Sequence, residues 1–178
     1  MRITISGPPG SGKTTVCKIV AERLDLDVII SGNIFRQMAR ESRMSLADFG
    51  RMCEADPEAD RKLDERMVEI ARCQDNIILE GRLTAYMLTR NHIPAFRVYM
   101  DADLDVRSAR VVEREGGTVE QRREEIMQRE ECEVRRYLKY YDIDIRDRSI
   151  YDLIVDTTYL TPSEVADRIC EAAVEQNG

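Results

Sequence analysis

The run Gly-Pro-Pro-Gly-Ser-Gly-Lys-Thr at positions 7–14 matches the pattern G-x-x-x-x-G-K-[ST] at every position. An alternating segment at 2–6 precedes this run and predicts a strand, and apolar residues at helical spacing follow it over 15–24. The three glycines let the backbone turn tightly and point its N–H groups at an anion. Because the motif requires this strand–loop–helix order, the sequence predicts a phosphate-binding loop at 7–14.

Two polar side chains of this loop indicate what it binds. Lys13 can reach the outer phosphates of a nucleotide as a point charge, and the Thr14 hydroxyl can ligate Mg2+. The helix that begins here adds its positive end to the same site. The alternative, a glycine-rich turn that binds nothing, fits poorly because all eight positions match. We therefore expect phosphate contacts from Gly7, Pro8, Pro9, Gly10, Ser11, Gly12, Lys13, Thr14 and Thr15.

The net charge and the arginine content of the chain indicate which classes of ligand it can bind. The 178 residues carry a net charge of −7, which disfavours general nucleic-acid binding. Yet 23 of the 27 cationic residues are arginines, whose planar guanidinium suits phosphate oxygens. Solubility and helix-face ion pairs account for most of them, but an acidic chain rich in arginine can also hold a small polyanion in a local positive cleft. We expect small-molecule partners and no nucleic acid.

Composition excludes further classes. No stretch approaches the roughly 20 apolar residues of a membrane span, and the first strand begins within two residues, which leaves no room for a signal peptide. Five scattered cysteines without a C-x-x-C pair, beside a single histidine, indicate reduced thiols and not a zinc site. We expect a cytoplasmic protein of one domain, with no membrane partner, that works as a monomer.

Strand and helix patterns alternate along the rest of the chain. Strands are predicted at 27–30, 76–80, 96–100 and 151–155, with a break at 31–33. Helices are predicted at 34–43, after Ser45 as N-cap, at 56–73 with Pro57 in the first turn, at 103–114, at 118–141 and from 162 onward. This order predicts an α/β protein whose mostly parallel sheet carries helices on both faces and binds ligands beyond the carboxyl ends of its strands.

Three further polar clusters fall at strand ends or on the later helices. They are residues 31–36, residues 80–82, and a charged run with Arg110 and Arg114 on one helical face and Arg129, Glu133 and Arg136 on another. Taken singly, the helical groups fit solvated faces with weak ion pairs. Together with the loop at 7–14, and with a double glycine at 116–117 between the two helices, the clusters predict two phosphate sites that face each other.

These motifs make the chain resemble the nucleoside monophosphate kinases, and most closely their short archaeal-type cytidylate kinases. The resemblance covers nearly the whole chain and rests on GPPGSGKTT at 7–15, SGNIFR at 31–36, EGR at 80–82, R-E-x-x-E-x-x-R-Y at 129–137 and SIYDLIVDT at 149–157. It implies a P-loop NTPase-type doubly wound sheet of five parallel strands. The implied parts are a core (1–30, 74–115 and 126–178), a helical monophosphate-binding subdomain (31–73) and a short lid (116–125).

The resemblance also implies an activity and the residues that carry it. The γ-phosphoryl of ATP would pass to CMP or dCMP with Mg2+, and Arg110 would lie against adenine. Catalytic roles would fall to Lys13, Arg82, Arg114, Arg129 and Arg136. The acceptor would be bound by Ser31, Arg36, Arg61, Arg82, Arg129, Glu133 and Arg136. Glu80 would orient a metal-bound water or else cap a helix, and Asp101 is a second candidate for the metal role.

The residues expected to recognise the base differ from those of the bacterial branch of the family. There the base-reading arginine lies 21 positions before the arginine of the strand-exit motif, a spacing that leads from Arg82 to Arg61 in this chain. The bacterial branch also has Asp where this chain has Leu83, and it carries a longer acceptor-side insert. Asp60 and Arg51 are therefore alternative partners for the base.

Two other functions are compatible with the phosphate-binding loop. A kinase of the same fold could act on adenylate, uridylate or shikimate. A nucleotide-dependent switch is the other alternative, but the chain lacks the N-K-x-D motif of GTP switches, and EGR stands after its third strand in place of D-x-x-G.

Overall fold

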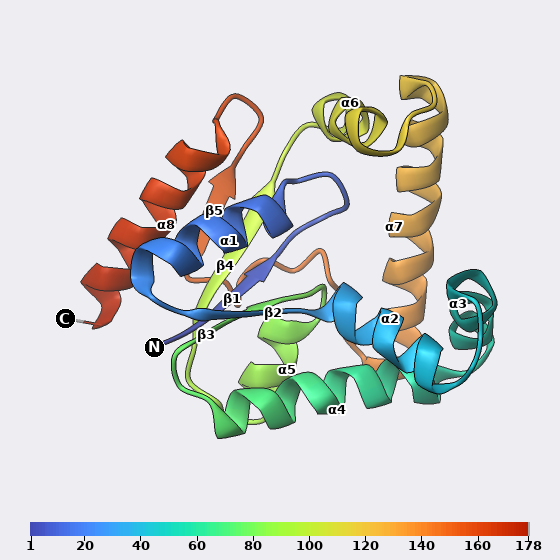
Figure 1. The fold of residues 1–178 in the computed structure, drawn as a ribbon, viewed down its shortest axis with the longest axis horizontal. Helices are drawn as coiled ribbons and strands as arrows, with labels where there is room; N and C mark the ends of the chain where they lie inside the picture. The colour runs from blue at the N-terminus through green and yellow to red at the C-terminus, as the bar shows by residue number, and fades with distance from the viewer. Residues whose placement is uncertain (178) are drawn as a thin grey trace.

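The computed structural model describes residues 1–177, except for the side chains of residues 46, 47, 50, 51, 54 and 177. Arg51, one candidate for base recognition, therefore lies outside the described residues. Five parallel strands form one sheet in the order β2-β3-β1-β4-β5 (Figure 1). The strands are β1 (Arg2–Ser6), β2 (Asp27–Ile30), β3 (Ile77–Glu80), β4 (Phe96–Asp101) and β5 (Leu153–Asp156). This topology confirms the predicted fold class.

The core lies on both faces of the sheet because side chains alternate along each strand. In β3, Ile77 and Leu79 pack on the face covered by α4 (Pro57–Cys73) and α5 (Thr84–Arg90). Ile78 packs on the opposite face, against α1 (Lys13–Leu24) and α8 (Pro162–Asn177). Figure 1 shows these two helical layers on either side of the sheet.

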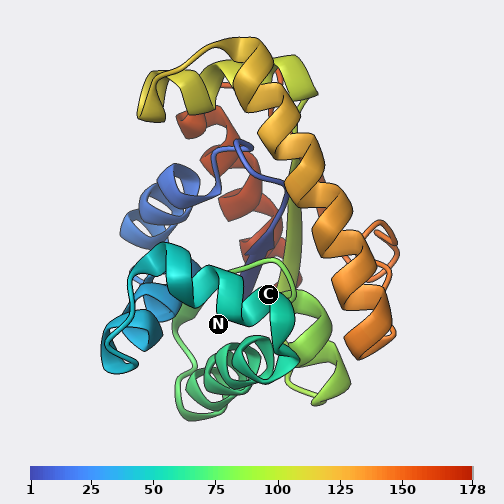
Figure 2. The same cartoon turned by 90° about the vertical axis from the view of Figure 1, so that its right-hand side faces the viewer.

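Helices beyond the carboxyl ends of the strands complete the molecule. They are α2 (Ser31–Glu41), α3 (Leu46–Ala55), α6 (Leu104–Glu115) and α7 (Val119–Tyr141). Figures 1 and 2 show α7 running from the end of α6 along this edge of the sheet. Residues 116–118 form the connection between α6 and α7, and 119–125 are the first turns of α7. None of the helices in residues 1–177 is both long and apolar enough to cross a membrane.

The helix starts agree with the polar residues that mark them in the sequence. The side chain of Ser45 accepts a hydrogen bond from the Asp48 amide at 3.1 Å and caps α3. Asp56 caps α4 in the same way, through the Glu58 amide at 3.0 Å, and Pro57 occupies the first turn. Both predicted starts are confirmed.

The structure differs from the predicted elements at two places. The break predicted at 31–33 is absent because α2 begins at Ser31, directly after β2. Helix α5 is not predicted at all. Residues 84–88 are all buried, and a helix without an exposed polar face lacks the periodic pattern that identifies helices in a sequence.

Candidate active site

The loop at 7–14 adopts a conformation that requires its glycines. Gly10 and Gly12 have φ angles of 81° and 90°, which side chains of L-residues rarely adopt. A Cβ at Gly10 would lie 2.6 Å from the backbone oxygen of Arg107 in α6, so this position also lacks space for a side chain. The loop ends at Gly12, and α1 begins with Lys13. The N-terminus of α1 therefore faces the ligand side of the loop, as anion binding requires.

Lys13 crosses the loop that precedes it. Its Nζ donates a hydrogen bond to the backbone oxygen of Pro8 at 2.9 Å. Burial lowers the pKa of Lys13 to about 8; Glu80 opposes this shift, while Arg82 and Arg129 add to it. The nearby negative charge does not fully compensate the ammonium group of Lys13. A bound phosphate would supply the missing negative charge.

Thr14 and Glu80 bring two oxygen donors together beside Lys13. The Thr14 hydroxyl donates to Oε2 of Glu80 at 3.4 Å, and Glu80 is 8% exposed at the carboxyl end of β3. A hydroxyl and a carboxylate next to a phosphate-binding loop suit Mg2+, which takes a few protein oxygens and completes its shell with water and substrate phosphates. The pair thus fits the metal role predicted for both residues.

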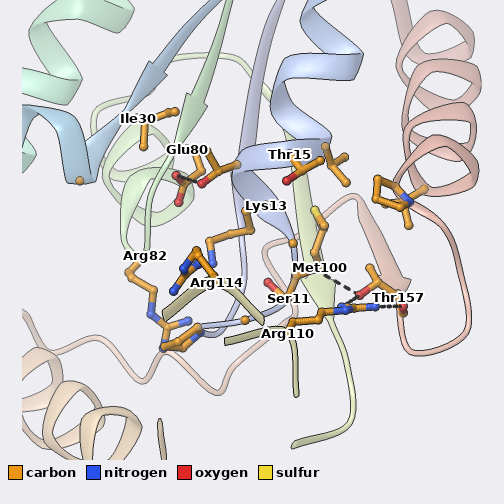
Figure 3. Close-up of a pocket in the computed structure, with 18 of the residues that line it drawn as sticks. Ser11, Lys13, Thr15, Ile30, Glu80, Arg82, Met100, Arg110, Arg114 and Thr157 are labelled. Carbon is orange, nitrogen blue, oxygen red and sulfur yellow. Dashed lines mark hydrogen bonds between the residues drawn. The ribbon is translucent and has the colours of Figure 1, made fainter. Parts of the chain in front are cut away.

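Two adjoining cavities lie at this edge of the sheet. The loop cavity, of about 790 Å³, is lined by the loop residues 9–15 and by Arg110, Arg114 and Thr157. Figure 3 shows Lys13 of α1, Arg110 of α6 and Arg82, which lies between β3 and α5, around this cavity. The helical cavity, of about 620 Å³, lies between α2, α4 and α7. Five residues line both cavities and mark where they meet: Ser31, Gly32, Arg36, Arg82 and Arg129.

A buried carboxylate holds two of these arginines. Oε2 of Glu133 accepts a hydrogen bond from Nε of Arg82 at 2.7 Å, and its Oε1 accepts from Nε of Arg129 at 3.0 Å. Glu133 is 4% exposed. Burial alone would raise the pKa of Glu133, but the two guanidinium groups lower it below its usual value. Glu133 is therefore ionised at neutral pH and orients both arginines toward the junction of the cavities.

Arg136 and Arg36 border the helical cavity on opposite sides. Nε of Arg136 in α7 lies 2.9 Å from Oδ2 of Asp60 in α4, and both side chains are largely buried. Arg36 is exposed, and its Nη1 donates to the backbone oxygen of Gly32 at 3.3 Å. The predicted acceptor residues Ser31, Arg36, Arg82, Arg129, Glu133 and Arg136 all line this cavity.

Arg110 and Arg114, the two arginines of α6 expected to bind the donor nucleotide, both line the loop cavity. Arg110 donates to the hydroxyl of Thr157 at 3.0 Å and to its backbone oxygen at 2.7 Å. Arg114 is exposed, and its guanidinium pairs with the neighbouring Glu115. Arg110 is thus held in place before any ligand binds, whereas Arg114 makes an exposed pair with Glu115 that a phosphate can replace.

Some predicted residues lie elsewhere. Arg61 is exposed and lines neither cavity, and its neighbour Asp60 faces the helical cavity instead. Asp101 pairs with Arg148 at 2.7 Å and lines neither cavity. Gly7 and Pro8 shape the loop, but they do not line the loop cavity, which begins at Pro9.

The sequence does not single out Arg107 of α6, whose side chain hydrogen-bonds to the backbone of the phosphate-binding loop. This side chain is 8% exposed and donates to the backbone oxygens of Ala102 at 2.9 Å and Pro9 at 3.2 Å. It also donates to Oε1 of Glu130 in α7 at 3.0 Å. Its position in an arginine-rich helix is the sole signal in the sequence, and that signal does not separate a buried arginine from an exposed one.

A phosphate-binding loop that faces a cluster of arginines across two joined cavities defines a P-loop kinase, in which one cavity holds the phosphoryl donor and the other the acceptor. Residues 2–159 match the cytidylate kinase-like family, and the chain belongs to that family. The cytidylate kinase of Methanococcoides burtonii is 41% identical over 178 residues, which cover 100% of this chain and 99% of that protein. The cytidylate kinase of Archaeoglobus fulgidus is 42% identical over 172 residues, or 97% and 94% of the two chains.

Solved structures with low sequence identity share the fold. The shikimate kinase of Bacteroides thetaiotaomicron superimposes with a TM-score of 0.64 at 15% identity, covering 96% of each chain. An uncharacterized protein from Eubacterium ventriosum gives a TM-score of 0.75 at 17% identity, covering 98% of each chain. These similarities support the architecture, while the acceptor is inferred from the family and from the cavity itself.

Proposed function

We propose that this protein is a cytidylate kinase that transfers the γ-phosphoryl group of ATP to CMP or dCMP and releases ADP with CDP or dCDP. The observation that carries this proposal is the junction of the two cavities, where Arg36, Arg82 and Arg129 are shared. A phosphoryl group that passes from the loop cavity to the helical cavity must cross this junction. Cations concentrated there stabilise the charge on the migrating group.

The reaction needs positioning and charge rather than covalent chemistry. An acceptor phosphate oxygen is already ionised at neutral pH, so the site needs no general base. Arg36 and Arg82 bind this phosphate, and Arg129 and Arg136 reach toward the transferring group from α7. Lys13 and Arg114 bind the phosphates of ATP, with Arg110 beside the adenine. Held in this way, the two nucleotides react as if in one molecule.

Mg2+ would be held by Thr14 directly and by Glu80, through water or directly, on the side of the loop cavity next to Lys13. When bound, it neutralises charge on the β- and γ-phosphates of ATP. Lys13 and Arg114 add positive charge of the protein's own beside the same phosphates.

Closure of the site completes the proposal. We propose that the monophosphate-binding subdomain (31–73) and the lid (116–125) move toward the core (1–30, 74–115 and 126–178) when both nucleotides bind. Such a closure excludes water, which would otherwise accept the phosphoryl group and hydrolyse ATP. We also propose that the enzyme works as a cytoplasmic monomer, since a single chain forms both cavities and its substrates are small soluble nucleotides.

An acceptor panel tests this function. ADP release from ATP is measured by a coupled assay with CMP, dCMP, UMP, AMP and shikimate, and with no acceptor. We expect rapid ADP release with CMP or dCMP and almost none without an acceptor. Turnover with AMP or shikimate alone would assign the chain to another kinase of this fold. Slow hydrolysis that no acceptor accelerates would instead indicate a nucleotide switch.

Arg36→Ala distinguishes the two sides of the site. Arg36 is exposed and makes one weak contact with Gly32, so its loss leaves the fold intact. Because it faces the acceptor phosphate, we expect the KM for CMP to rise at least about tenfold, the loss of one charge-assisted contact, while the KM for ATP changes little. Steady-state kinetics with each substrate varied in turn provide the measurement. Equal increases in both KM values would remove Arg36 from the acceptor site.

A further inference from the structure

Two carboxylates line the helical cavity away from its junction with the loop cavity. Asp60 and Asp64 stand one turn apart on the same face of α4, and both line the cavity. The phosphate-binding arginines Arg36, Arg82 and Arg129 line the opposite part, where the two cavities meet. A nucleoside monophosphate whose phosphate sits among these arginines therefore extends its base toward α4.

Each carboxylate is held by one oxygen and presents the other. Oδ2 of Asp60 pairs with Nε of Arg136 at 2.9 Å, and Oδ2 of Asp64 accepts a hydrogen bond from the Tyr141 hydroxyl at 2.6 Å. No hydrogen-bond partner for Oδ1 of either residue exists among the described residues. Asp60 is only 8% exposed. Oδ2 of Asp60 is itself buried and, although it lies beside Arg136, it receives no hydrogen bond from the described residues. A carboxylate in this state at the wall of a ligand cavity calls for a donor from the ligand.

The walls around the two carboxylates suit a flat base. Phe35 of α2 and Leu63 of α4 line the helical cavity together with the two carboxylates, and the Phe35 ring makes an edge contact with Phe49 at 5.0 Å between centroids. The volume of about 620 Å³ lies in the usual range for small-molecule sites. Apolar walls with a few fixed polar groups provide contact area and orientation together.

We propose that Asp60 and Asp64 are the base-reading residues and select cytosine over uracil by accepting hydrogen bonds from its exocyclic amino group. This inference rests on the proposed kinase activity. Cytosine presents the N4 amino donor, for which aspartate and glutamate are the matching acceptors. Uracil presents the O4 acceptor at the same place, so its oxygen would face the carboxylate of Asp60, which is paired with Arg136, without an intervening proton.

The ionisation of Asp64 agrees with this role. Burial raises the pKa of Asp64 to about 7, against the hydrogen bond from Tyr141, which lowers it. Near neutral pH this carboxyl therefore exists in both forms, of which the acid can donate to the N3 acceptor of cytosine. The N3 position of uracil carries a proton and cannot accept that hydrogen bond.

Asp64→Asn is the variant that tests the proposal. The asparagine amide can donate to O4 of uracil, and it removes one acceptor for the cytosine amino group. We expect the ratio of kcat/KM for CMP to that for UMP to fall about ten- to a hundredfold, mainly through the KM for CMP, with the KM for ATP unchanged. Glu65→Gln, an exposed carboxylate in the next position of the same helix, is the matched control and should leave the ratio unchanged.

A second measurement uses the unaltered enzyme and does not depend on the folding of a variant. The monophosphate of 2-pyrimidinone riboside lacks any substituent at C4, and we expect its KM to exceed that of CMP at least about tenfold. An unchanged CMP-to-UMP ratio in Asp64→Asn, or an equal KM for CMP and this analogue, would overturn the proposal. Either result is distinct from a failure of the kinase assignment, in which the unaltered enzyme would not phosphorylate CMP at all.

Discussion

Lys13→Ala should lower kcat for CMP phosphorylation by about 10³-fold, which corresponds to about 4 kcal/mol of transition-state stabilisation. Lys13 lines the loop cavity, and its amine lies against the phosphate loop, 2.9 Å from the backbone oxygen of Pro8. Among the residues that the structure describes, no other lysine lines this cavity. The variant should keep its melting temperature, because removal of a desolvated cation relieves an unfavourable interaction.

Matched measurements separate this chemical role from a structural one. Lys18→Ala, an exposed lysine on the same helix, should retain full activity and melting temperature. In the unaltered enzyme Lys13, with its pKa lowered to about 8, loses its proton as the pH rises through 8, so ATP binding should weaken there. Lys13→Ala should lack that part of the pH dependence. Activity above half of the unaltered value would contradict the assignment of Lys13.

Arg82→Ala has the second large expected effect, and it changes both activity and stability. Arg82 lines both cavities, so its loss should lower kcat by about 10³-fold, at the lower end of the range for an arginine that stabilises phosphoryl transfer. Its removal also leaves Arg129 as the remaining cationic partner of the buried Glu133 among the residues that the structure describes. Breaking a buried pair in this way should cost about 3 kcal/mol of unfolding free energy.

The pH dependence of stability identifies the source of that loss. With Arg82 present, the pKa of Glu133 is lowered, so its stabilising contribution is present above the unfolded pKa and is lost as the pH falls through the folded pKa. Without Arg82, burial dominates and raises the pKa of Glu133. Acidification then protonates this buried carboxylate and removes its unfavourable charge, so the variant becomes more stable relative to the unaltered protein as the pH falls. Denaturant unfolding at pH 7 and pH 4.5 measures this effect. The unfolding free energy of Arg82→Ala should lie closer to that of the unaltered protein at pH 4.5 than at pH 7. Arg135→Ala, an exposed arginine of α7 paired with Glu131, is the control and should show almost no loss at either pH.

The phosphate-binding loop, the parallel sheet and most helix boundaries could be predicted because their signals are local. The eight loop residues are contiguous, and Ser45 and Asp56 cap their helices through amides two or three residues away. The remaining parts of the site depend on long-range contacts. Glu133 meets Arg82 across 51 residues, and which arginines share a carboxylate is decided by the packing of α7 against the sheet. Asp60 and Arg61 show why such contacts are hard to predict. They are adjacent in one helix but point in different directions. The 21-residue spacing from Arg82 favours Arg61, whereas Asp60 is the residue that lines the cavity.

Arg107 has a consequence for how the long helix α7 moves. By joining Pro9 of the loop to Glu130, it anchors α7 at about its midpoint. Arg129 lies next to the anchored residue and Arg136 lies on its far side, whereas 119–125 lie between the anchor and the glycine connection at 116–117. We propose that α7 pivots about this contact when the site closes, so that residues 119–125 move toward bound ATP while Arg129, beside the anchored residue, keeps its distance from the loop.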